Sequence, residues 1–202
     1  MVEHWWCSLQ QADMVCAHII LEKGGAMPVQ GLHHVAYRCR NAKETVDFYT
    51  RHLKLPFKMA LAENRVPSTK EWSPHIHIFF QMEDASYVAF FELPEAPEMA
   101  LDKNTPDWVQ HLALNVPDVD TLNGYKKSLL EAGVDVVGPT NHGFCQSIYF
   151  FDPNGHRLEL TVDTSTDDIM ARLLSEAGPT LEYWNEHKTA AAGDLDWIHK
   201  DA

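Results

Sequence analysis

The sequence lacks several features that would assign it to a class of protein at once. No stretch approaches the roughly 18 consecutive apolar residues that a membrane-spanning helix needs. The first residues lack the basic start and apolar run of a secretory signal. The four cysteines form no C-x-x-C pair and are widely scattered, at Cys7, Cys16, Cys39 and Cys145. This pattern is typical of reduced cysteines rather than of a disulfide framework, and it predicts a cytoplasmic protein.

Positive charge is also scarce. The 16 Lys and Arg residues stand against 29 Asp and Glu residues, which gives a formal net charge of −13. Nucleic acids and anionic membranes are bound by basic surfaces, so this charge argues against both as partners. The length of 202 residues and the 45% of hydrophobic residues suit one globular domain or two small similar halves. We therefore expect a small molecule as the partner.

Two segments of the chain resemble each other. The strand-like stretches Gly31 to Arg38 (G-L-H-H-V-A-Y-R) and Trp108 to Asn115 (W-V-Q-H-L-A-L-N) both carry a His followed two residues later by Ala. Each stretch continues into a polar turn and an amphipathic helix. Asn41 is the expected start of the first helix, and Asp118 or Asp120 that of the second.

Three strand-like runs then follow each helix. They are Phe57–Leu61, His75–Met82 and Tyr87–Leu93 in the first half, and Asp135–Gly138, Gln146–Phe151 and Arg157–Val162 in the second. The order β-α-β-β-β thus occurs twice, which predicts an α+β fold. We expect two βαβββ modules that form a curved sheet around a metal-binding cleft.

The sequence predicts four parts. They are an N-terminal extension at 1–29, a first module at 30–100, a second module at 101–163 and a C-terminal helical tail at 164–202. The tail is expected to hold two helical segments, Thr164 to Ala177 and Thr180 to Lys188, with Ile169, Leu173 and Trp184 as packing residues.

Side chains at matching positions of the repeat are candidates for metal ligands. Alternate residues of a strand share a face, so His34 and His111 lie on the polar sides of their strands. The F-F-E-L ending of the first half aligns with the R-L-E-L of the second, which makes Glu92 and Glu159 equivalent. Imidazole and carboxylate together suit a divalent first-row metal. We predict that one metal ion is bound by four side chains, those of His34, Glu92, His111 and Glu159.

These residues resemble the vicinal oxygen chelate superfamily, which includes glyoxalase I, bleomycin-resistance proteins and type I extradiol dioxygenases. The likeness covers about residues 30 to 163. The stretch from Thr140 to Glu159 looks most like an extradiol dioxygenase: a His in a loop, a Tyr on the next strand, then D-P-x-G and a Glu. The resemblance implies Fe(II) held by His34, His111 and Glu159.

The resemblance also implies roles for residues that do not bind the metal. Tyr149 and His142 match groups beside a bound catechol, and His77 matches an acid–base histidine, although His75 is close enough to compete. The implied reaction is the opening of an aromatic ring by dioxygen. A homodimer is expected, and because paired modules can assemble within or across subunits, one chain or two can form the site.

Glu92 favours a different reaction. Two-module glyoxalase I enzymes typically use a His/Glu plus His/Glu set, so a fourth ligand indicates a lyase, isomerase or epimerase with Ni, Zn, Co or Mn in place of Fe(II). In that alternative Glu92 or Glu159 would move the substrate proton. A further alternative is a non-catalytic protein that binds an aromatic drug. The sequence leaves the substrate open.

Overall fold

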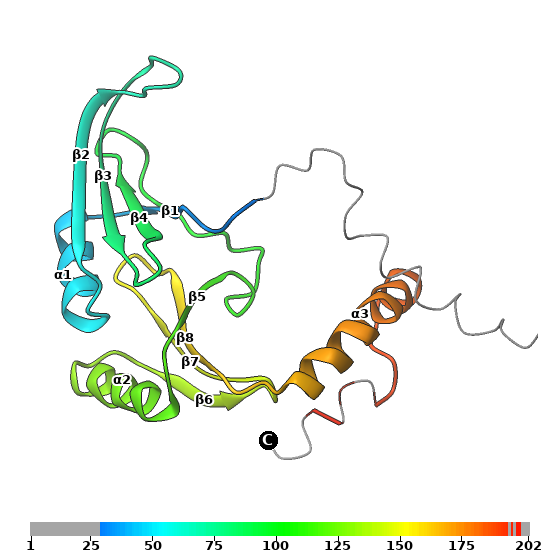
Figure 1. Cartoon of the computed structure of the whole chain (residues 1–202). Coiled ribbons are helices and arrows are strands. Elements are labelled where there is room, and N and C mark those ends of the chain that lie inside the picture. Colours follow the sequence, from blue (N-terminus) through cyan, green and yellow to red (C-terminus); the bar gives the residue numbers. More distant parts are fainter. Residues whose placement is uncertain (1–28, 194, 196, 199–202) are drawn as a thin grey trace, which may run out of the picture. The chain divides into compact units, whose positions relative to one another are not determined.

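The computed structural model describes residues 29–193, 195, 197 and 198. The predicted N-terminal extension therefore lies almost entirely outside the described residues. The first module comprises β1 (His34–Cys39), α1 (Ala42–His52), β2 (Phe57–Arg65), β3 (Trp72–Gln81) and β4 (Tyr87–Glu92). The second comprises β5 (His111–Asn115), α2 (Val119–Glu131), β6 (Val137–Asn141), β7 (Cys145–Phe151) and β8 (Arg157–Asp163). The helix α3 (Asp167–His187) follows β8 (Figure 1).

Each module forms its own four-stranded sheet. The strand orders are β1-β4-β3-β2 and β5-β8-β7-β6. In each sheet the first strand pairs in parallel with the last one, and the other neighbours are antiparallel. The predicted α+β fold with a repeated βαβββ unit is confirmed. The expected joining into one curved sheet is not seen, because no strand of one sheet pairs with the other among the described residues.

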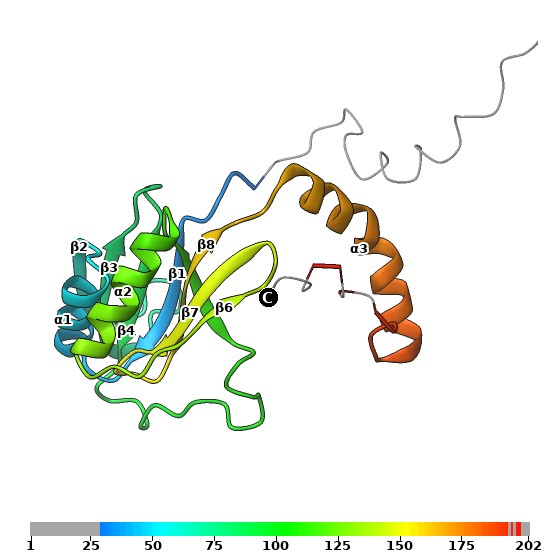
Figure 2. The same cartoon turned by 90° about the horizontal axis from the view of Figure 1, so that it is seen from below.

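The two helices of the modules begin at polar caps. The side chain of Asn41 accepts a hydrogen bond from the backbone N of Glu44 at 2.9 Å. Asp118, rather than Asp120, does the same for the backbone N of Thr121 at 2.7 Å. Each cap satisfies one N–H group that the helix leaves without a partner, which stabilises a helix by about 1 kcal/mol. The helices α1 and α2 lie next to each other (Figures 1 and 2).

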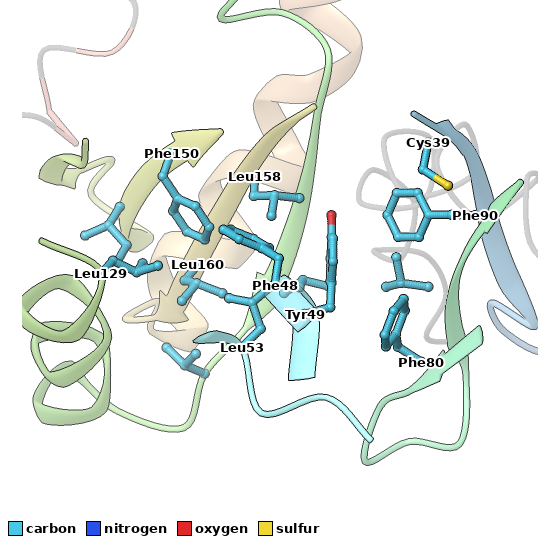
Figure 3. Close-up of a cluster of buried hydrophobic side chains, with 14 of the residues drawn as sticks. Cys39, Phe48, Tyr49, Leu53, Phe80, Phe90, Leu129, Phe150, Leu158 and Leu160 are labelled. Carbon is cyan, nitrogen blue, oxygen red and sulfur yellow. The ribbon is translucent and has the colours of Figure 1, made fainter. Parts of the chain in front are cut away.

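One apolar core joins the two modules. The helix-covered face of the first sheet contributes Phe80 and Phe90, and that of the second contributes Leu158 and Leu160. Tyr49 of α1 is fully buried between the two groups (Figure 3). Since both sheets turn their helix-covered faces toward this core, their opposite faces point away from it.

A buried carboxylate also connects the modules. Asp152, in the turn between β7 and β8, is 5% exposed. It accepts hydrogen bonds from the backbone N of Asn154 and His156 at 2.9 and 2.8 Å. The hydroxyl of Tyr49 donates to the same carboxylate from the other module at 3.2 Å. Burial, with the nearby charge of Asp152, raises the pKa of Tyr49 well above its usual value, so this donor stays protonated.

The C-terminal tail contains one long helix where two were expected. The helix α3 continues through Pro179, and none of its residues is buried. Ile169 and Leu173 are half-buried, but Trp184 is 51% exposed, so its predicted packing role is wrong. Proline removes one N–H donor from a helix, and an exposed helix can satisfy the freed carbonyl with water. No helix in the described part of the chain is long and apolar enough to cross a membrane.

The junction between the modules can be tested with Tyr49→Phe. The change removes one hydrogen bond to a buried carboxylate, so we expect the free energy of unfolding to fall by about 1.5–3 kcal/mol. Urea denaturation should show a lower midpoint at an unchanged m-value. The matched control is Tyr37→Phe, because Tyr37 packs near the same Phe90 (ring centres 6.1 Å apart) without a bond to Asp152. Equal losses in the two variants would contradict the role of Asp152.

Candidate metal site

His111 and Glu159 lie side by side on the face of the second sheet that points away from the core. His111 Nε2 is 2.9 Å from Glu159 Oε2, and Glu159 is only 6% exposed. Two ligands that each lie about 2.1 Å from a metal, at right angles to each other, are about 3.0 Å apart. The pair therefore has the separation of neighbouring ligands around one metal ion.

A contact with the backbone fixes the orientation of the His111 ring. Its Nδ1 lies 3.1 Å from the carbonyl oxygen of Val109. A carbonyl oxygen can only accept, so Nδ1 carries a proton, and in the neutral imidazole Nε2 then presents its lone pair toward Glu159. This backbone contact is the kind that orients metal-binding histidines. The residues present therefore fit a divalent metal.

Tyr149 and His142 extend the pair into a hydrogen-bonded chain. The hydroxyl of Tyr149 donates to Glu159 Oε1 at 3.2 Å and lies 2.8 Å from His142 Nε2. Because a phenol has one proton, His142 Nε2 must be the donor when Tyr149 donates to Glu159. Burial and then the charge of Glu159 raise the pKa of Tyr149, so its hydroxyl stays protonated at neutral pH.

These side chains border a cavity of about 520 Å³. The residues around it are His111, Ala113, Asn115, His142, Phe144, Cys145, Tyr149, Glu159, Thr161 and Asp163. Its volume and its mixture of apolar and polar groups suit a small organic ligand. A larger cavity, of about 800 Å³, lies under the segment between the modules and shares His111 but not Glu159 or Tyr149.

Arg157 was not predicted as a site residue. Its guanidinium carbon lies 4.4 Å from the centre of the Tyr149 ring. It stands two residues before Glu159 on β8, so alternation along the strand places both on the same face. That spacing was the signal that could have identified it. Arg157 brings a positive charge next to an otherwise acidic site.

His34 and His77 lie together in the first module. Their ring centres are 6.1 Å apart, and His77 stacks on Phe91 at 3.6 Å. Burial, followed by the nearby His34 and His75, lowers the pKa of His77 to about 4. His77 is therefore neutral at pH 7. His75 instead bonds through Nδ1 to the carbonyl oxygen of Ser73 at 2.7 Å.

The predicted ligands of the two modules do not meet within one chain. Among the residues that the structure describes, no three His, Cys, Asp or Glu side chains are placed to hold one metal ion. His34 and His111 each lie on the outer face of a different sheet, and the inner faces of both sheets share the core. The candidate residues thus form two separate groups within the chain: His34 with His77, and His111 with Glu159.

The predicted equivalence of Glu92 and Glu159 is wrong. The alanine that follows the strand histidine pairs with Glu159 in the second sheet but with Ala89 in the first. Ala89 is therefore the counterpart of Glu159. Glu92 lies three residues further along, on the helix-covered face, where its carboxylate accepts a hydrogen bond from the backbone N of Ala42 at 2.6 Å. The four predicted ligands do not form one set.

A family model described as the Glyoxalase/Bleomycin resistance protein/Dioxygenase superfamily matches residues 31–160. A curated relative, the putative ring-cleaving dioxygenase MhqA of Bacillus subtilis, is 27% identical over 140 residues. The match covers 68% of this chain and 42% of the relative. The chain thus spans less than half the length of that curated relative.

Solved structures share the fold at low sequence identity. A glyoxylase/bleomycin resistance protein/dioxygenase domain from Frankia sp. EAN1pec matches with a TM-score of 0.55 and 16% identity, over 67% of this chain and 99% of that chain. The fosfomycin resistance protein FosX of Listeria monocytogenes, solved with Mn(II), matches with a TM-score of 0.51 and 18% identity, over 71% and 99%. With the repeated βαβββ unit and the family match, these findings show that the chain belongs to the glyoxalase/bleomycin resistance/dioxygenase (vicinal oxygen chelate) superfamily.

Proposed function

We propose that the chain is a subunit of an Fe(II)-dependent enzyme that opens the ring of a catechol with dioxygen. The observation that carries the proposal is the contact of His111 and Tyr149 with the two oxygens of one buried carboxylate, Glu159. Glu159 thus connects the candidate metal ligand His111 to the proton donor Tyr149. The relative named as a ring-cleaving dioxygenase supports the same reaction.

We infer that the third ligand, His34, comes from a second copy of the chain. In the described part of the chain, β1 and β5 lie at the edges of their sheets. Edge strands present backbone groups that can pair with another chain. A two-fold dimer in which β1 of one copy meets β5 of the other would contain two identical sites. Each would combine His34 and His77 of one copy with His111 and Glu159 of its partner.

The proposed donor set suits the proposed metal. Two imidazoles and one carboxylate on one side of an ion leave positions open for substrate and dioxygen, and this set is typical of non-haem Fe(II) oxygenases. Fe(II) held there would supply the electron transfer that dioxygen needs to react with the ring. Glu159 keeps the Tyr149 hydroxyl in reach of the same space.

The surrounding residues would handle protons. When the diol binds, Tyr149 would turn its one proton from Glu159 toward an oxygen of the diol, and its raised pKa keeps the hydroxyl protonated for this hydrogen bond. His142 would hold the phenol through its 2.8 Å contact. His77, neutral at pH 7 because its pKa is lowered to about 4, would accept a hydrogen bond from a hydroxyl of the diol.

The isomerase alternative depended on Glu92 as a fourth ligand and candidate base. Its carboxylate binds the backbone N of Ala42 at the start of α1, which removes the residue that favoured this alternative. The resemblance to fosfomycin resistance proteins concerns the fold, since the identity is 18%. We therefore keep ring cleavage as the proposed reaction.

Measurements of metal binding can distinguish the proposed ligands from Glu92. Glu159→Ala and His111→Ala should each abolish stoichiometric iron binding, because each removes one of two adjacent ligands. Glu92→Gln is the control and should retain iron, since the amide oxygen can still accept from the backbone N of Ala42. Elemental analysis of protein purified without oxygen measures the outcome. Full occupancy in Glu159→Ala would refute the assignment of this ligand.

The reaction itself can be tested on a panel of substituted catechols. The iron-loaded protein should consume one dioxygen per ring and give ring-opened products that absorb visible light. Tyr149→Phe should lower kcat by about 10- to 100-fold, since it deletes one hydrogen bond to a charged oxygen, about 1.5–3 kcal/mol. Its iron content should not change. The proposal fails if the iron-loaded protein consumes no catechol while it isomerises an α-hydroxycarbonyl compound.

A further inference from the structure

The C-terminal residues Trp197 and Ile198 lie against the loop that carries His142. Gly143 in this loop has a φ of +84°, and a Cβ there would be 2.3 Å from Ile198 Cγ1 and 2.6 Å from the Ile198 carbonyl oxygen. Glycine alone permits both this backbone conformation and this approach. The neighbours of Gly143 on either side, His142 and Phe144, border the cavity of the candidate site.

Trp197 is held in turn by α3. The guanidinium carbon of Arg172 lies 3.9 Å from the centre of the Trp197 ring. Arg172 Nε donates to Glu176 Oε1 at 2.7 Å, which fixes the plane of the guanidinium. The positive charge is attracted by the π-electrons of the indole ring, so this contact anchors Trp197 to α3. The backbone N of Ile198 closes a turn onto the carbonyl oxygen of Leu195 at 3.0 Å.

Hydrogen bonds also hold the loop, one of them from the backbone N of His142 to the carbonyl oxygen of Cys145 at 2.8 Å. The backbone N of Gly143 donates to Asn141 Oδ1 at 2.8 Å, and the backbone N of Thr164 donates to the carbonyl oxygen of Phe144 at 2.9 Å. None of these bonds occupies the side of Gly143 on which a Cβ would stand, where the nearest atoms belong to Ile198. Contact with Ile198 on the open side of this glycine therefore limits movement of the residue next to His142.

We propose that Ile198, anchored through Trp197 to α3, is a positioning residue that keeps the His142 imidazole in contact with the Tyr149 hydroxyl. This inference rests on the proposed function, in which His142 holds the phenol. Ile198 itself would touch neither substrate nor metal. Its role is to reduce the conformational freedom of the loop, so that the 2.8 Å contact between Nε2 and the phenol persists.

The decisive experiment uses metal-free protein and does not depend on activity. Nitrogen NMR of the His142 imidazole and hydrogen exchange of the His142 backbone N–H, which bonds to the Cys145 carbonyl oxygen at 2.8 Å, report on the loop. Ile198→Ala should shift the Nε2 resonance and speed exchange by about tenfold, as expected when a local contact is lost. Ile198→Val, which keeps most of the side chain, should leave the Nε2 resonance and the exchange rate close to their wild-type values. Leu181→Ala, at a position on α3 that is 65% exposed, is the control and should change neither.

A kinetic measurement separates this inference from the proposed function. With Fe(II) and a catechol, Ile198→Ala should lower kcat by roughly tenfold, at nearly unchanged KM and iron content. This loss is smaller than the effect of removing a positioned acid–base group outright. Unchanged NMR and exchange in Ile198→Ala would overturn the proposal whatever the reaction is. Changed NMR with unchanged kcat in an active enzyme would also overturn it. Changed NMR in a protein that opens no catechol would support the positioning role and refute the proposed function.

Discussion

The packing of both sheets onto one shared core is the constraint on which the rest of the structure depends. Phe80 and Phe90 of the first sheet and Leu158 of the second meet around the buried ring of Tyr49 (Figure 3). Burial of this much apolar surface is the main favourable contribution to folding. Because the helix-covered faces are used in this way, the faces that carry the candidate ligands point outward. Under the proposed function, the chemistry would therefore occur between two copies of the chain.

Contacts within the chain hold the group formed by His111 and Glu159 in place. Glu159 is nearly buried and contacts His111 and Tyr149, and Tyr149 contacts His142. A buried carboxylate needs such partners, since an unpaired charge away from water is costly. A proton or a metal ion between His111 and Glu159 satisfies the same requirement. Arg157 over the ring of Tyr149 adds a positive charge to a chain with a formal net charge of −13.

Local patterns in the sequence predicted most of the helices and strands, and they identified two candidate ligands that lie in contact. The caps at Asn41 and Asp118 and the repeated strand order depend on neighbouring residues, so they could be identified without the structure. The proximity of His111 and Glu159 was predicted from their places in the repeated strands, and the two side chains are in contact. The position of Glu92 could not be predicted in this way, because an alignment of two short motifs does not fix the register of strand pairing. A shift of three residues moves a side chain to the opposite face of the sheet. The contact of Ile198 with Gly143 joins residues far apart in the sequence, and no local pattern indicates it.

Metal binding by mixed subunits tests the shared site most directly. His34→Ala and Glu159→Ala protein, each unable to form a complete site, would be refolded together so that half of the dimers contain one chain of each kind. Such a dimer has one site with both changes and one site with neither, so iron binding should return to about one quarter of all sites, as two-fold symmetry requires. The account is contradicted if the mixture binds no more iron than the separate variants, or if His34→Ala alone retains full occupancy.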